Sequence, residues 1–339
     1  MPKLISSDSI SIQKAIIHFL DLNTTEAVVS NKTTAIDDDI DDYLKAHIEK
    51  AFNSDDIKKC EFEREGFVSQ NLTDLRHNFV EFSQELARRF FGVMQDAGTI
   101  PSGDLIEVLA NIGPEEFFCV FKMNYKTSFV HEFRAIAETH SINFVKHHGI
   151  LPGKTAKLDE AFLINLDTRE IYLLEKKFEI NGVKDFYISP TILGCTDTLS
   201  VKSQVQLVRK TAEKIYQEHY GETVDMKPRV AEAIYKELHA QEQFKIENIY
   251  ENFTDAFPEM GPELRSAMEG SPVEAHKLQP VPDSEYKKIA RQTVKSNFGV
   301  EVKIPTKMYS NKEAVEFIHH PDGSVSLLIK GIVNGKEES

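Results

Sequence analysis

The chain has 339 residues, of which 41% are hydrophobic, and its 54 acidic and 40 basic side chains give a formal net charge of −14. This length and hydrophobic content suffice for one large globular domain or for two to three ordinary ones, each with its own core. The negative net charge opposes any uniform attraction to nucleic acid or to an anionic membrane. Binding to phosphate would therefore require a local basic surface.

The cysteines and the N-terminal segment indicate the cellular setting. Cys60, Cys119 and Cys195 are far apart in sequence and form neither a CxxC pair nor an even disulfide framework. We therefore expect a reducing, cytoplasmic compartment. Lys14 and His18 interrupt the apolar N-terminal pattern, and no run reaches the roughly 18 apolar residues that a spanning helix needs. The sequence predicts neither a signal peptide nor a membrane anchor.

The N-terminal half begins with a predicted hairpin and a predicted helix. Residues 9–20, SISIQKAIIHFL, partly alternate in polarity, and together with AVVS at 27–30 they predict a β-hairpin. Five aspartates then precede an apolar pattern with helical spacing that runs to Ala51. Aspartates in a first turn stabilise the positive end of a helix, so we interpret this acidic cluster as a helix start.

Further helix and strand patterns follow up to Ser189. A helix is predicted from about Leu72 to Met94, because aromatic and leucine side chains recur there on one side of a helix. Two β-rich runs flank Asn124 and Tyr125, and residues 161–189 supply more strands. The sequence thus predicts an α+β protein whose N-terminal domain, residues 1–189, is an antiparallel sheet of five or more strands backed by helices.

The remainder of the chain divides into three predicted parts. Residues 190–269 have helical apolar spacing, with helices expected at 201–215, 227–239 and 246–253. Prolines and glycines interrupt every period in 270–283, which is predicted to be a linker. Residues 284–339 read as a basic helix followed by a small sheet.

Basic residues gather in the last of these parts. Between Ser284 and Lys336 there are nine Lys or Arg against five Asp or Glu, although the whole chain is acidic. If residues 283–298 form one helix, Lys288, Arg291 and Lys295 stack along one face of it. Such a row is typical of a solvated helix face, and a surface that contacts phosphate is the alternative.

The order of several longer blocks resembles a known family. These blocks are SISIQKAIIHFLD at the start, FVEFSQELARRFF, FFCVFKMNY, AFLINLDTREIYLLEKK, ILGCTD, and the ending from GVEVKI to SVSLLIKG. Together they resemble the bacterial nucleoid-associated protein family of about 37 kDa, and the resemblance spans most of the chain. It implies association with the nucleoid and binding of double-stranded DNA in the cytoplasm, with no cofactor and no reaction to carry over.

Charge placement and the resemblance together predict a DNA-binding protein with little sequence preference. The main predicted contacts are Lys287, Lys288, Arg291, Lys295 and Lys303. A second candidate surface follows the polar loop at Gly194 and consists of Lys202, Arg209, Lys210 and Lys214. A homodimer would double the basic surface, so we also expect self-association.

Two other classes of function stay open. Asp159 or Asp167, followed by Glu175 and Lys177, has the D…ExK order of metal-dependent nucleases, in which two carboxylates hold Mg²⁺ and the lysine orients water. The alternative is that these residues have no catalytic role: Asp167 would then lie in a hairpin turn, and Glu175 and Lys177 on an exposed face. A protein-interaction adaptor is the other class, because an acidic half can dock a basic partner.

The histidine pairs 147–148 and 319–320 are poor metal ligands, because adjacent strand residues point to opposite faces. No phosphate-binding glycine loop, GxSxG elbow or HExxH motif is present in the sequence.

Overall fold

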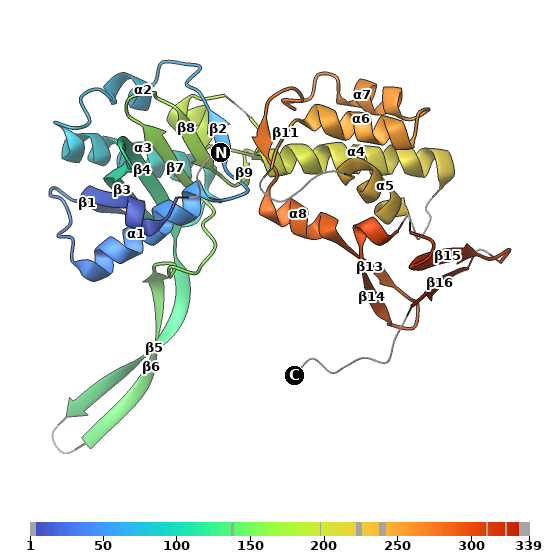
Figure 1. The fold of residues 1–339 in the computed structure, drawn as a ribbon. Helices are drawn as coiled ribbons and strands as arrows, with labels where there is room; N and C mark the ends of the chain where they lie inside the picture. The colour runs from blue at the N-terminus through green and yellow to red at the C-terminus, as the bar shows by residue number, and fades with distance from the viewer. Residues whose placement is uncertain are drawn as a thin grey trace. The chain divides into compact units, whose positions relative to one another are not determined.

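The computed structural model describes residues 5–136, 139–196, 198–221, 226–236, 242–309, 311–322 and 324–331 (Figure 1). The chain forms two compact units, an N-terminal unit from Lys3 to Thr198 and a C-terminal unit from Leu199 to Ser339. Helices and antiparallel strands occur in both, which confirms the predicted α+β class. In the described ranges, no helix is long and apolar enough to cross a membrane.

A six-stranded antiparallel sheet forms the centre of the N-terminal unit, in the order β1-β3-β4-β7-β8-β2. It confirms the prediction of five or more antiparallel strands. The strands are β1 (Ile10–Leu20), β2 (Lys58–Cys60), β3 (Gly103–Ile112), β4 (Glu115–Asn124), β7 (Ala161–Asn165) and β8 (Ile171–Leu174).

Helices cover both faces of this sheet. The covering elements are α1 (Asp38–Phe52) on one face, and α2 (Phe67–Asn71), α3 (Phe79–Ala97) and the π-helix η2 (Ile188–Leu193) on the other. Successive residues of β4 therefore enter different cores: Phe118 belongs to the α3 side and Phe117 to the α1 side. Burial on both faces explains why the central strands read as continuous apolar runs.

The start of the chain differs from the predicted hairpin. β1 pairs along nearly its whole length with β3, and residues 27–30 contribute only a bridge between Val28 and Phe19. The hairpin prediction was wrong because β3 offers β1 a long ladder and two buried faces, whereas AVVS is too short to compete. The 3₁₀ turn η1 (Ser7–Ser9) precedes β1.

Both predicted helices of this unit are present. The carboxylate of Asp37 accepts a hydrogen bond from the backbone N–H of Ile40 at 2.9 Å, so the acidic cluster caps and fills the first turn of α1 as predicted. Helix α3 begins at Phe79, later than predicted. The apolar pattern in the sequence starts before the helix because Leu72 and Leu75, in the turns that precede α3, are buried in the same core as α3.

The N-terminal unit has two further ribbons and extends beyond the predicted boundary. Strands β5 (Lys126–Ile136) and β6 (Thr139–Ile150) form a long two-stranded ribbon that projects from the sheet (Figure 1). Strands β9 (Phe178–Ile180) and β10 (Val183–Asp185) form a short one. The predicted boundary near Ser189 falls inside η2, which is buried in the α3-side core together with Cys195.

The C-terminal unit has a helical core. Its helices are α4 (Val201–Tyr220), α5 (Met226–Tyr235), α6 (Ile246–Ala256) and α7 (Gly261–Met268). Of the helix predicted at 227–239, residues 237–239 lie outside the described ranges. The predicted linker 270–283 is extended but packs on this core, where Val281 is buried and β12 (Gln279–Pro280) pairs with β11 (Gln243–Phe244). The finer division of the chain after 189 stays a prediction.

The chain then forms one short helix and two hairpins. These elements are α8 (Asp283–Ala290), β13 (Arg291–Lys295), β14 (Glu301–Pro305), the 3₁₀ turn η3 (Thr306–Met308), β15 (Val315–His319) and β16 (Val325–Ile329). Strand β13 pairs with β14, and β15 pairs with β16.

Two titratable side chains are buried together on the α3 side of the sheet. Nε2 of His18 lies 3.9 Å from Oε1 of Glu107, and both side chains are fully buried. Nδ1 of His18 accepts a hydrogen bond from the N–H of Ser30 at 3.0 Å, which leaves the proton on Nε2. Neither oxygen of Glu107 has a hydrogen-bond partner among the described residues. Burial lowers the pKa of His18 to about 4 and raises the pKa of Glu107 well above its usual range.

We expect Glu107→Gln to stabilise the protein increasingly as the pH rises. A carboxyl whose pKa is raised by folding contributes stability below its unfolded pKa, and this contribution is lost as the pH rises towards the folded value. An amide has no charge to bury, so the melting temperature of the variant relative to wild type should climb as the pH rises above 4.5, the ordinary pKa of a glutamate. Glu115→Gln, an exposed change on β4, is the control. A difference that does not change with pH would contradict this account.

Candidate functional site

Three of the five main predicted contacts, Arg291, Lys295 and Lys303, lie on a β-ribbon rather than on a helix. Helix α8 ends at Ala290, and Arg291 already has extended backbone angles, φ −143° and ψ 128°. The prediction of one helix over 283–298 was therefore wrong after Ala290. The β-branched residues Thr293 and Val294 favour a strand, and β14 supplies a partner whose Ile304 is buried.

The register of this ribbon nevertheless brings three predicted cations together. Arg291 pairs with Pro305, Thr293 with Lys303, and Lys295 with Glu301. Paired residues and alternate residues of a strand share a face, so Arg291, Lys295 and Lys303 lie on one side. All three are exposed. We call this surface the ribbon face.

One carboxylate lies on the ribbon face. Nζ of Lys295 is 2.5 Å from Oε1 of Glu301, and this contact holds the pKa of Glu301 below its usual value. Arg291 and Lys303 form no ion pair with another described residue, so they carry the uncompensated charge of the face.

Glu285 fixes helix α8, and with it the start of the ribbon. Its side chain is fully buried, and Oε1 accepts hydrogen bonds from Nε2 of Gln206 at 2.6 Å and from Nζ of Lys288 at 2.9 Å. Nη1 of Arg209 lies 4.0 Å from Oε2. Lys288 and Arg209 are thus both engaged with Glu285, although the side chain of Lys288 is still 50% accessible, and Lys287 is exposed.

The second predicted surface, on α4, is smaller than the sequence indicated. Arg209 also faces Glu213 at 3.7 Å, and Lys202 is half-buried. Lys210 is exposed, and Lys214 is exposed beside Glu218 at 3.6 Å. The N-terminus of α4 is capped by the buried Ser200, whose Oγ accepts a hydrogen bond from the N–H of Ser203. The hydroxyl group of Ser200 therefore occupies the place at the N-terminus of α4 where the sequence analysis allowed a phosphate oxygen to bind.

A groove of about 1200 Å³ continues from the ribbon face within the same unit. Arg291 and Pro305, at one end of the ribbon, line it, and so do side chains of α5, α6, η3 and β15. Its further cations are Arg229, Lys236 and Lys312, and its acidic residues are Glu232, Asp255 and Glu316. Nζ of Lys330 neutralises Glu316 at 2.6 Å. The lining is mildly basic.

Aromatic residues that the sequence analysis did not single out also line this groove. The rings of Tyr309 and Phe317 stack with centroids 5.4 Å apart and an interplanar angle of 12°. The hydroxyl groups of Tyr309 and Tyr235 are buried without a hydrogen-bond partner among the described residues. Burial raises the pKa of Tyr309 to about 12, so it stays a neutral donor. Tyr309 follows η3 and Phe317 lies in β15, so the spacing of these residues in the sequence does not indicate that their rings stack.

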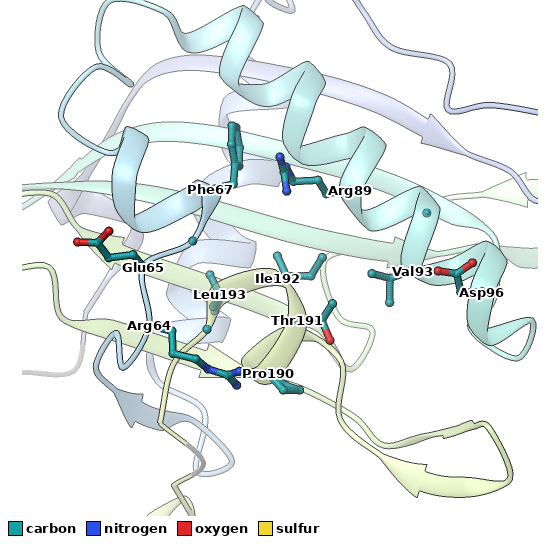
Figure 2. Close-up of a pocket in the computed structure, with 13 residues that line it drawn as sticks. Arg64, Glu65, Phe67, Arg89, Val93, Asp96, Pro190, Thr191, Ile192 and Leu193 are labelled. Carbon is teal, nitrogen blue, oxygen red and sulfur yellow. The ribbon is translucent and has the colours of Figure 1, made fainter.

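A second hollow, of about 430 Å³, lies in the N-terminal unit between α2, α3 and η2 (Figure 2). Figure 2 shows Arg89 beside Phe67, with the guanidinium 4.6 Å from the ring centroid. Arg89 also pairs with Glu85 at 2.9 Å. The lining has two arginines and two carboxylates, Glu65 and Asp96, so its charge favours neither anions nor cations.

The residues of the nuclease-like pattern have separate partners. Asp167 lies in the β7–β8 turn, 3.4 Å from Arg76, and Asp159 lies 3.4 Å from Lys176. Lys177 packs over the ring of Phe186. Among the described residues, no three His, Cys, Asp or Glu side chains are grouped to hold a metal.

Glu175 is buried rather than on an exposed face. Its Oε1 lies 2.9 Å from Nζ of Lys58, and the carboxylate accepts hydrogen bonds from the N–H and Oγ of Ser189. Burial follows because Glu175 comes just after β8 on the α3 side, where Ser189 of η2 covers it. The pair ties β2, β8 and η2 together.

Glu160 and Lys122 are two further buried polar residues of this unit. Together with Lys58 and Glu175 we call them the buried polar row. Glu160 accepts hydrogen bonds from Oη of Tyr187 at 2.5 Å and from Nδ2 of Asn124 at 2.7 Å. Nζ of Lys122 donates to Oδ1 of Asn124 at 2.8 Å and to the carbonyl of Pro101. Burial lowers the pKa of Lys122 to about 8 and raises that of Glu160. Lys122 and Glu160 are buried, and the hydrogen bond from Tyr187 to Glu160 fixes the residue that directly precedes η2.

We expect Glu175→Gln to destabilise the fold by about 3 kcal/mol, because removing one partner of a buried ion pair leaves the other charge buried and uncompensated. The neighbouring pair Lys59–Glu170 is exposed, with side chains 54% and 39% accessible, so Glu170→Gln should cost less than about 1 kcal/mol. Urea unfolding of both variants checks this. Equal costs would contradict a structural role for Glu175.

The structure describes both side chains of the first histidine pair and one side chain of the second. His147 and His148 are adjacent on β6 and exposed, and His148 lies 3.4 Å from Oγ1 of Thr127. A ring nitrogen of His320 lies 2.7 Å from Oγ of Ser326. The side chain of His319 is outside the described part of the chain.

A family model described as nucleoid-associated protein YejK matches residues 16–335. The matched range includes the central sheet from Ile16 of β1 onward, the helical core and the C-terminal hairpins. Its description names an association with the nucleoid and no reaction. No curated protein matches the sequence.

Proposed function

Because this chain belongs to the family of nucleoid-associated protein YejK, we propose that it binds double-stranded DNA in the cytoplasmic nucleoid through the ribbon face. The observation that carries the proposal is the register of β13 and β14, which gathers Arg291, Lys295 and Lys303 on one exposed surface. Such a protein would contribute to chromosome organisation.

Three features of the ribbon face support DNA as its ligand. A two-stranded ribbon is narrow enough to enter the major groove of DNA. Lysine and arginine side chains that meet phosphates release counterions, and such contacts carry no sequence information. The cations lie on a local surface of an otherwise acidic chain, so attraction to DNA is confined to one region.

The other exposed lysines form a secondary surface in this proposal. Lys287, Lys210 and Lys214 are exposed and add charge in the same unit. Lys202, Arg209 and Lys288 contribute less, because they are half-buried or engaged with Glu213 and Glu285. We propose no catalytic step, since the carboxylate of Glu175 is committed to Lys58 and Ser189.

We expect Arg291→Ala with Lys303→Ala to weaken binding about equally on unrelated duplexes. Losing two phosphate contacts should flatten the slope of log K against log salt by about two. Fluorescence anisotropy with a short duplex, across a salt series, measures both effects. The matched control is Lys32→Ala with Lys184→Ala, which removes the same charge from exposed positions of the N-terminal unit.

An unchanged salt slope in the double variant would remove the ribbon face from the interface. If wild-type protein fails to bind even at low salt, direct DNA binding is excluded. Nucleoid association would then depend on a protein partner, for which the acidic N-terminal unit is the candidate surface.

A further inference from the structure

The β5–β6 ribbon, here called the arm, exposes a row of large apolar side chains. Its register pairs Phe129 with Lys146, His131 with Phe144, and Phe133 with Ile142, which puts these six residues on one face. The exposed fractions are 65% for Phe129, 59% for Phe133, 72% for Ile142 and 85% for Phe144. We call this the apolar face of the arm.

The opposite face of the arm has a different character. It pairs Glu132 with Asn143 and Val130 with Val145, so polar and smaller apolar side chains alternate. The asymmetry matters because a two-stranded ribbon by itself is marginally stable in water and needs a covering surface. Soluble monomers rarely expose a contiguous apolar patch of this kind without a binding role.

We propose that the apolar face of the arm packs against the same face of a second copy of this chain, so that the arms join a homodimer. A second copy is present wherever the chain folds, so the arm is covered as soon as it forms. A contact between identical faces is isologous and closes at two subunits. This proposal is independent of DNA binding by the ribbon face.

The exposed area is sufficient for such a contact. With about 200 Å² for each aromatic side chain, the three phenylalanines expose on the order of 400 Å² in each arm. Ile142 adds to this, so two arms packed face to face would bury roughly 1,000 Å², about the minimum for a specific interface.

Charge also favours contact at the arm. Two copies that each carry −14 repel one another, so they must meet where acidic residues are few. Residues 126–150 contain three Lys or Arg against two Glu, and Glu132 lies on the opposite face. The apolar face can therefore meet its copy without bringing described carboxylates together.

The same face is less suited to DNA. Among the side chains that the structure describes on it, Lys146 is the single lysine or arginine, whereas the ribbon face has three such residues. A phosphate backbone needs a series of cations, and the apolar row would stay exposed against it.

The test uses the full chain in sedimentation equilibrium from about 1 to about 100 µM, a range that brackets a micromolar dimer. The face variant is Phe133→Thr, Ile142→Thr and Phe144→Thr, because threonine keeps a high strand propensity while removing apolar area. The control is Val130→Thr with Val145→Thr on the opposite face. Wild type and control should be dimeric, and the face variant should dissociate at least about 100-fold more readily.

A second measurement does not depend on the variants. Wild-type protein labelled with light and heavy nitrogen is mixed, treated with a short amine cross-linker and digested. Mixed-isotope links between arm lysines, Lys126 and Lys146, are expected, and links confined to one isotope would overturn the proposal.

Several results would overturn the proposal. These are monomeric wild type at the highest concentration, a face variant that stays as dimeric as wild type, and a control that dissociates equally. Monomeric wild type whose face variant binds duplex more weakly would assign the arm to DNA.

Discussion

The buried carboxylate of Glu285 is the contact on which the candidate interface depends. It joins α8 to α4 through Gln206 and accepts a hydrogen bond from the exposed Lys288 of its own helix, so α8 has a fixed place on the helical core. Because α8 runs directly into β13, this contact also determines where the ribbon face begins. A carboxylate buried to this extent is costly unless cations and donors surround it, and Arg209 supplies a further positive charge at 4.0 Å. Arg209 and Lys288 thus stabilise the fold through Glu285, which compensates part of their charge.

The protein uses the same simple element, an antiparallel two-stranded ribbon, for two different surfaces. In β13–β14 the alternate positions carry cations, and in β5–β6 they carry phenylalanine and isoleucine. Strand geometry makes both possible, because a period of two collects one kind of side chain on one face. Charge and apolar area are thereby kept on separate ribbons, so the proposed phosphate-binding surface and the proposed contact between two copies do not overlap.

The polar row in the N-terminal unit shows how a catalytic pattern can arise from a structural need. Glu175 matches the residue order of a nuclease motif, yet its oxygens are occupied by Lys58 and Ser189. Lys122, Glu160 and Tyr187 continue the row, so charged groups at one end of the sheet hold η2 in place. Buried carboxylates need partners of this kind, and those partners come from other strands.

The sequence by itself determined the α+β class, the helix capped by Asp37 and the helical core after Ser200, because capping and apolar spacing are local properties. Of the cations that it grouped, Arg291, Lys295 and Lys303 share a surface in the structure. Their contact with DNA stays a prediction. Only the tertiary structure decided that this surface is a ribbon, that β1 pairs with β3, and that Glu175 is buried. Each of these outcomes depends on a partner distant in the chain: β14 for Arg291, β3 for β1, and Lys58 with Ser189 for Glu175. Local propensity does not encode such partners, because strand pairing and the burial of a charge are set by contacts between distant segments.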